Sequence, residues 1–176
     1  LELIPDPNLP VGGPGRSTDG LFALTEFKVE VASAESPDQK QWVKFTRALA
    51  DFANDDRRLG PLYADRDGKT GLTGPAEFAI DDSDDTAWGI DAGPGRRNRR
   101  RQAIFVADRN IAVAGGTHLT FHFVQKHGGW NSDDNQNMNL GRFRVLATGD
   151  EVHFEDGKVL PGEVASLLER SPALWN

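Results

Sequence analysis

The feature that most constrains the fold is a dense acidic segment at residues 79–88, Ala-Ile-Asp-Asp-Ser-Asp-Asp-Thr-Ala-Trp. Two apolar residues precede four carboxylates and two hydroxyls, and a tryptophan closes the segment. Carboxylates packed this densely repel one another, so the segment requires either full solvation or a hard cation, which takes roughly six to eight oxygen ligands. The pattern predicts a tight loop that binds Ca²⁺.

The spacing of these acidic residues is not that of a helix-loop-helix calcium site. Such a loop requires glycine at its sixth position and glutamate at its twelfth, and counting from Asp81 this chain has Thr86 and Ala92 there. A solvated acidic turn is the simpler alternative to a calcium loop, and a catalytic pair of carboxylates is a further one. The sequence leaves these alternatives open.

Length and composition limit the class of protein. A chain of 176 residues has the size of one domain with a substantial core. Its formal charge of -7 argues against a general nucleic-acid-binding or anionic-membrane-binding surface. Cysteine is absent, which excludes disulfides, thiolate metal sites and a cysteine nucleophile. The apolar runs are too short to span a bilayer, so we expect neither a nucleic-acid partner nor a membrane partner.

Short alternating segments separated by loops rich in Gly, Asp and Asn predict an all-β fold. Strands are expected over residues 21–31, 42–50, 102–107, 117–126, 140–148 and 152–154, with a short helix over 162–170. Residues 33–41 are predicted to form a polar turn, and a helix over 43–52 is the alternative to the second strand. This arrangement favours an antiparallel β-sandwich, most simply a jelly roll.

The first two predicted strands carry distinctive apolar patterns. Within residues 21–31 the alternation slips once, around Thr25 and Glu26, which indicates a β-bulge or a strand buried on both faces. Within residues 42–50, Trp42, Phe45 and Leu49 are expected to point into the core.

The composition divides the chain into three parts. Residues 1–20 are rich in proline and glycine without apolar periodicity, so they are expected to form a linker or an ordered N-terminal arm. Residues 21–156 form the predicted β-sandwich domain, and residues 157–176 form a C-terminal connector with a short helix. No initiator methionine or signal peptide opens the sequence, so we expect it to be a piece of a longer protein.

The acidic segment resembles the Ala-Ile-Asp-Gly-Asp-x-x-Thr-x-Trp loop of galactose-binding-like β-sandwich domains, which include discoidin domains and many carbohydrate-binding modules. Asp81, Thr86 and Trp88 match this motif, whereas Asp82 replaces its glycine and Ser83 its second aspartate. The resemblance implies a structural calcium in this loop and a sugar held by neighbouring loops. The expected metal ligands are Asp81, Asp82, Ser83, Asp84 and Thr86, with Glu26 from a preceding strand; a surface role for Glu26 is the alternative.

A closer resemblance covers nearly the whole chain. It rests together on Gly13-Pro-Gly-Arg16, Leu24-Thr-Glu-Phe27, the acidic segment, residues 88–98, Leu119-Thr-Phe121, residues 127–134, Leu140-Gly-Arg-Phe-Arg144 and Leu160-Pro-Gly-Glu163. These motifs look like those of a planctomycete multidomain family that combines cytochrome-c-like domains with planctomycete-specific domains. The resemblance implies an exported protein, with a secreted, periplasmic or cell-surface location and neighbouring domains as partners.

Trp130 is the candidate sugar platform. It lies in a polar loop without apolar neighbours, and an exposed aromatic ring of this kind can stack on the face of a pyranose. Its expected polar companions are His127, Asn131, Asp133, Asp134 and Asn135, although the same group could hold a second cation. Trp88, by contrast, is expected in the core.

A run of arginines at residues 96–101 is the clearest charge anomaly in this acidic chain. Arg96, Arg97 and Arg99 are candidates to recognise a carboxylated or sulfated polysaccharide, because guanidinium groups bind such anions with paired hydrogen bonds. A solvated loop, or one that pairs with nearby carboxylates, is the structural alternative. Nucleic acid is a weaker reading, because no aromatic residue interrupts the run.

The common sequence signatures of hydrolases, zinc peptidases, phosphate-binding loops and haem attachment are absent from the sequence. The four histidines are scattered, and His118 and His122 would lie too far apart on a strand to share a metal. We therefore expect a non-catalytic, calcium-stabilised carbohydrate-binding module. The alternatives are a docking domain without its own ligand and, third, catalysis on a polysaccharide.

Overall fold

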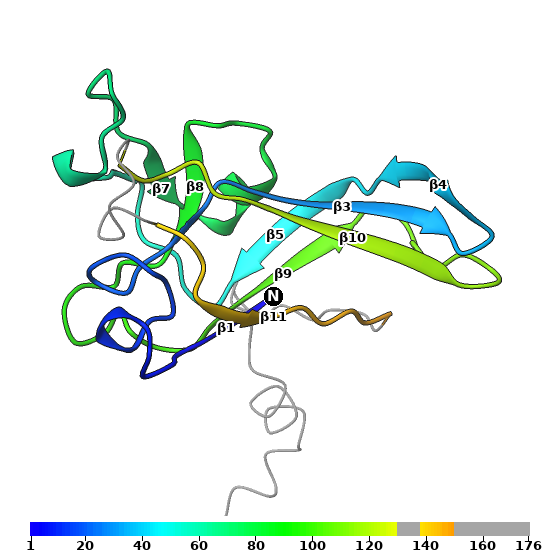
Figure 1. The fold of residues 1–176 in the computed structure, drawn as a ribbon, viewed down its shortest axis with the longest axis horizontal. Helices are drawn as coiled ribbons and strands as arrows, with labels where there is room; N and C mark the ends of the chain where they lie inside the picture. Colours follow the sequence, from blue (N-terminus) through cyan, green and yellow to red (C-terminus); the bar gives the residue numbers. More distant parts are fainter. Residues whose placement is uncertain (130–137, 150–176) are drawn as a thin grey trace, which may run out of the picture.

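The computed structural model describes residues 1–129 and 138–149, and these form an all-β domain with three short 3₁₀ helices (Figure 1). The strands are β1 (Glu2–Ile4), β2 (Ala23–Leu24), β3 (Glu26–Ser33), β4 (Ser36–Trp42), β5 (Phe45–Ala50), β6 (Arg57–Arg58), β7 (Leu72–Gly74), β8 (Thr86–Gly89), β9 (Arg101–Ala107), β10 (Thr117–Val124) and β11 (Arg142–Arg144). The helices are η1 (Pro10–Gly12), η2 (Pro61–Tyr63) and η3 (Ala76–Ile80). The predicted all-β class is confirmed.

Two antiparallel sheets pack against each other to form the body of the domain. One has the strand order β11-β1-β9-β5 and the other β10-β3-β4. In Figure 1 the long β3–β10 ribbon runs beside β5 and β9. A cluster of phenylalanines fills the space between the sheets, with Phe27 of β3 stacked on Phe105 of β9 at 4.3 Å between ring centroids. The ring centroids of Phe45 of β5 and Phe123 of β10 each lie 5.5 Å from that of Phe27.

A third sheet closes one end of the body. Its order is β2-β8-β7-β6, and the β7–β8 pair is parallel, which departs from the purely antiparallel prediction. Trp88 of β8 is fully buried, as predicted, and its ring meets Phe22 edge-on at 5.1 Å. The indole N–H of Trp88 donates to the carbonyl of Phe52, 3.1 Å away. This contact ties the third sheet to the chain that leaves β5.

Residues 1–20 are built into the domain. β1 lies between β9 and β11 and pairs with both, and Leu3 is fully buried. The remaining residues of this segment make turns that contact residues 138–141, including the bridge between Gly15 and Leu140. Of the two expectations for this segment, the structure has the ordered arm.

The sequence patterns located some strands and misjudged others. The phase slip in residues 21–31 marks a real break, since Thr25 separates β2 from β3. β9 and β10 match their predicted spans to within two residues. The turn predicted over 33–41 is wrong, because residues 36–42 form β4, and so is the helix over 43–52. The strand expected over 140–148 is limited to β11.

The predicted inward position of Trp42 is also wrong. Trp42 pairs with Glu30 on β3, and its side chain is 56% exposed. Val43, the next residue, is buried instead and donates its N–H to the carbonyl of Val29. Because neighbouring residues of an extended chain face opposite sides, an error of one residue in phase reverses the face.

The strand predicted over 152–154 and the helix over 162–170 lie outside the described residues. Within residues 1–129 and 138–149 no helix is long and apolar enough to cross a membrane.

Candidate functional site

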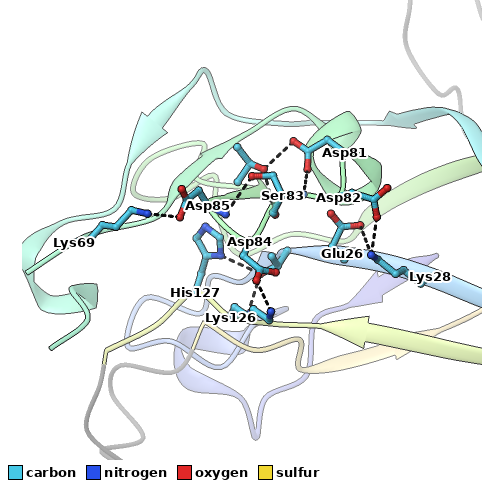
Figure 2. Close-up of polar contacts among 12 residues, drawn as sticks. Glu26, Lys28, Lys69, Asp81, Asp82, Ser83, Asp84, Asp85, Lys126 and His127 are labelled. Atoms are coloured by element: carbon cyan, nitrogen blue, oxygen red, sulfur yellow. Dashed lines mark hydrogen bonds and ion pairs between the residues drawn. The ribbon is translucent and has the colours of Figure 1, made fainter. Parts of the chain in front are cut away.

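The acidic loop between η3 and β8 closes on itself through short hydrogen bonds (Figure 2). The Asp81 carboxylate accepts the Ser83 N–H at 2.9 Å through Oδ1 and the Thr86 hydroxyl at 2.8 Å through Oδ2. The Ser83 hydroxyl accepts the N–H of Asp85 at 3.3 Å. Asp and Ser side chains commonly stabilise turns in this way, so Asp81, Ser83 and Thr86 have a clear structural role.

Three lysines from distant parts of the chain pair with the other carboxylates of the acidic loop, as Figure 2 shows. Lys28 Nζ lies 2.7 Å from Asp82, Lys126 Nζ lies 2.5 Å from Asp84, and Lys69 Nζ lies 2.5 Å from Asp85. These are exposed pairs, and each adds little to the stability of the fold because water screens it. Together they offset the charge repulsion that first suggested a cation.

Asp82 has a left-handed backbone, with a φ of 60°. Glycine adopts this conformation without steric cost, and aspartate is among the few other residues that tolerate it. The conformation explains physically why an aspartate can stand at the glycine position of the resembled motif. The acidic side chain gained there contacts Lys28.

Glu26 is the buried acidic side chain beside the loop in the part of the chain that the structure describes. It is 3% exposed, and its Oε1 atom has no hydrogen-bond partner among the described residues. Its other oxygen lies 3.8 Å from Lys28 Nζ. Burial and the charges of Asp82 and Asp81 raise the pKa of Glu26, and the Lys28 ammonium and the Ser83 N–H only partly oppose this. A buried, unpartnered carboxylate oxygen facing an acidic loop is suited to binding a cation.

The remaining geometry does not assemble a complete metal site. In the part of the chain that the structure describes, no group of three or more His, Asp or Glu side chains is close enough to hold a metal ion. Of the six predicted ligands, Glu26 alone presents a buried free oxygen, while Asp82 and Asp84 contact lysines. The calcium site therefore stays a prediction whose best support is Glu26.

His127, predicted to contact a sugar, is 5% exposed and lies behind the acidic loop. Its Nδ1 atom is 3.0 Å from the Thr25 hydroxyl, and its Nε2 atom has no partner among the described residues. Burial lowers the pKa of His127 and so favours the neutral ring. Gly71 packs against this ring so closely that a Cβ at that position would lie 2.0 Å from it. These contacts give His127 a place in the core.

The other members of the predicted Trp130 site lie outside the described residues. They are Trp130, Asn131, Asp133, Asp134 and Asn135.

The arginine run divides into inward and outward members. Arg97 pairs with Asp19 at 3.0 Å and with Asp91 at 3.1 Å, and its side chain is 16% exposed. Arg101 lies over the Phe52 ring at 4.6 Å, and Asn98 donates to the carbonyls of Gly13 and Asp19. Arg96, Arg99 and Arg100 are exposed. Arg97 therefore pairs with carboxylates of the fold itself. Arg96 and Arg99 remain available to a ligand.

Arg96 borders a polar cleft of about 400 Å³ at the end of β5. The cleft is lined by Phe52, Ala53, Asn54, Asp55, Asp56, Arg57, Asp91, Ala92 and Arg96. A second hollow of about 300 Å³ shares Asn54, Arg57 and Asp91 with it and adds apolar lining, including Leu59 and Tyr63. Arg57 and Asp91 form an ion pair where the two hollows meet.

Asn54 holds the walls of this cleft in place. Its amide donates to the Thr73 hydroxyl at 3.1 Å, and its carbonyl oxygen accepts the N–H of Asp91 at 3.2 Å. Burial alone would raise the pKa of Asp91, but the Gly93 N–H and the guanidinium groups of Arg57 and Arg97 outweigh it and lower the pKa. Asp91 is therefore a charged acceptor at neutral pH.

Sequence reasoning found Arg96 and missed the rest of this lining. The two adjacent aspartates at positions 55 and 56 were the available signal.

Comparisons of the chain with protein-family models, with curated proteins and with solved structures gave no match.

Proposed function

We propose that this chain is a non-catalytic carbohydrate-binding module, of a jelly-roll or galactose-binding-like type, that holds a polysaccharide in the cleft beside Arg96. The observation that carries the proposal is the polar lining of this cleft, which places donors and acceptors together at the end of a β-sandwich. Loops at the end of a rigid sandwich are a common position for ligand sites.

A sugar hydroxyl both donates and accepts hydrogen bonds, so a sugar site needs both kinds of partner. The guanidinium groups of Arg57 and Arg96 donate, the carboxylates of Asp55 and Asp56 accept, and these side chains line the cleft. The Arg96 guanidinium has no hydrogen bond or ion pair with another described side chain. It is therefore free to donate to a ligand without breaking a contact of the fold.

The charge of the lining favours a neutral sugar. Three aspartates (Asp55, Asp56 and Asp91) face two arginines (Arg57 and Arg96), and Arg97, which pairs with Asp91 at 3.1 Å, balances the third carboxylate. A site without net charge gives a carboxylated or sulfated chain no electrostatic attraction, so a neutral polysaccharide fits better than the acidic one that the arginine run alone suggested.

Calcium is part of the proposal as a stabilising ion. Glu26 would supply its buried oxygen, and Asp81 and Asp82 are acidic side chains of the loop whose charges raise the pKa of Glu26. The ion would add positive charge to that of Lys28 beside Glu26, and Lys126 and Lys69 would continue to pair with Asp84 and Asp85.

Affinity electrophoresis in gels containing galactomannan, glucomannan, xyloglucan or mixed-linkage β-glucan tests the cleft. We expect at least one of these neutral polymers to slow the wild-type chain. The Arg96→Ala and Asp56→Asn variants should each raise the dissociation constant about tenfold, the equivalent of about one hydrogen bond to a charged group.

Arg100→Ala is the matched control, because it removes an exposed arginine of the same run that does not line the cleft. Equal retardation of the Arg96→Ala, Asp56→Asn and Arg100→Ala proteins would refute the cleft as the binding site.

A docking domain is the second candidate, and one observation favours it. Phe143 and Leu146 are 40% and 61% exposed, on β11 and just after it. Exposed large apolar side chains can mark a protein interface. If this reading is correct, no polysaccharide will retard the chain, and a neighbouring domain of the same polypeptide will bind it in trans.

A further inference from the structure

We propose a second sugar-binding surface, formed by Trp42 and its polar neighbours on the outer face of the β10-β3-β4 sheet. It lies on different strands from the cleft and is argued from different residues. It does not depend on the cleft binding a sugar.

The pairing of the strands defines this face. Phe27, Val29 and Val31 of β3 point into the phenylalanine core, so the alternating residues Lys28 and Glu30 point outward. Trp42 is paired with Glu30, and His122 is paired with Lys28, which places both on the outward side. β4 is an edge strand of this sheet, and in Figure 1 the sheet extends away from the rest of the domain.

The Trp42 ring is exposed, but one side of it packs against a second ring. Its centroid lies 5.1 Å from the centroid of the His122 ring on β10, with the two rings tilted by 54°. β3 lies between these two strands, so the contact spans the width of the sheet. A ring held in one orientation loses less conformational entropy when a ligand stacks on it.

A network of polar groups borders the Trp42 ring. Glu30 Oε2 lies 3.2 Å from His122 Nε2, whose N–H donates to it, and 3.3 Å from Lys40 Nζ. The hydrogen bond from His122 is the main reason that the pKa of Glu30 is lowered, so Glu30 is a charged acceptor at neutral pH. The Lys40 ammonium is half exposed and can donate to a ligand as well.

This combination favours a sugar over a protein or a lipid surface. A protein interface is built around a contiguous apolar centre, whereas Trp42 is bordered by a carboxylate, an ammonium group and an imidazole. A pyranose ring needs one aromatic plane for its C–H groups and hydrogen-bonding partners at the rim for its hydroxyls.

The charge of this surface selects the class of sugar. The Glu30 carboxylate and the Lys40 ammonium cancel each other beside Trp42. The ligand is therefore an uncharged polysaccharide. Two separated surfaces on one module would let it bind two points of the same polymer.

The test measures binding of the full chain to soluble galactomannan, glucomannan and mixed-linkage β-glucan by tryptophan fluorescence and by calorimetry. We expect Trp42→Ala to weaken binding about tenfold, Trp42→Phe to retain most of it, and Glu30→Gln to weaken it about threefold. Leu62→Ala is the control, because Leu62 is an exposed apolar residue of similar exposure on η2. Unchanged thermal unfolding of each variant excludes a folding defect.

The Arg96→Ala variant separates this surface from the cleft. Loss of affinity in Trp42→Ala, whether or not Arg96→Ala also binds less well, supports the surface described here. If Arg96→Ala binds less well and Trp42→Ala matches the wild type, the Trp42 surface is refuted and the cleft stands. If the affinity for these polymers, measured by calorimetry, is the same in every variant as in the wild type, both surfaces are refuted.

Discussion

At the scale of one residue, Glu26 carries an unfavourable electrostatic energy because it is buried beside the acidic loop. Its side chain is buried next to Asp81 and Asp82, one oxygen has no partner, and Lys28 is 3.8 Å from the other. Leaving a buried polar atom unpartnered costs about 1–3 kcal/mol. A cation bound beside Glu26 would relieve this cost.

The raised pKa of Glu26 predicts how stability depends on pH. The folded chain holds the Glu26 proton more tightly than the unfolded chain, so the burial penalty is absent at low pH and appears as the pH rises past 4.5. In the presence of a chelator, Glu26→Gln should therefore raise the melting temperature at pH 7 by about 2–4 °C.

The gap between Glu26→Gln and the wild type should close as the pH falls below the raised pKa of Glu26. Glu35→Gln, at an exposed glutamate, is the control and should leave the melting temperature unchanged. A Glu26→Gln protein that is less stable than the wild type at pH 7 would show that the carboxylate is satisfied by the fold.

At the scale of elements, the acidic loop shows which contacts a sequence reveals. The turn could be predicted from the sequence, because Asp81 and Ser83 each accept a hydrogen bond from the N–H two positions ahead. The three lysine contacts could not be predicted, since Lys28, Lys126 and Lys69 lie 54, 42 and 16 residues along the chain from their partners. The hypothesis of a cation rested on the repulsion between carboxylates and on the resemblance to a calcium-binding loop, and the fold supplies these ammonium groups as well.

The strands likewise include some that the sequence predicts and some that it does not. β9 was predicted from a short apolar run and β10 from the alternation of apolar and polar residues. β4 could not be predicted from its pattern, because almost all its residues are exposed and its structure comes from pairing with β3. The candidate surface at Trp42 was missed for the same reason, since its members come from three strands that meet only in the folded sheet.

Calcium binding is an element-scale prediction for the acidic loop. An ion bound only to the folded chain raises stability by RT ln(1 + [L]/Kd), which is about 2.7 kcal/mol at a hundredfold excess over Kd. We expect millimolar CaCl₂ to raise the melting temperature relative to a chelator by several degrees. The response should be lost in Glu26→Gln and kept in Glu35→Gln.

A melting temperature that is the same in CaCl₂ and in chelator would contradict a structural ion. The lysine pairs and the hydrogen bonds to Asp81 would then compensate the carboxylates of the acidic loop without an ion.

At the scale of the whole molecule, a phenylalanine core fixes two sheets, and the polar surfaces lie where that core ends. The cleft beside Arg96 is held by Asn54 and Trp88 at the end of β5, and Trp42 is held by His122 on an outer sheet face. Both places combine fixed side chains with nearly balanced charge. A rigid scaffold with such surfaces is suited to binding neutral, hydroxylated polymers.

The most direct test of this account is a glycan array probed with the wild-type chain, covering neutral, uronic-acid-containing and sulfated polysaccharides. We predict binding to at least one class of neutral polysaccharide and weaker signals from the charged classes. No binding to any polymer on the array, or binding confined to sulfated and uronic-acid chains, would contradict the account.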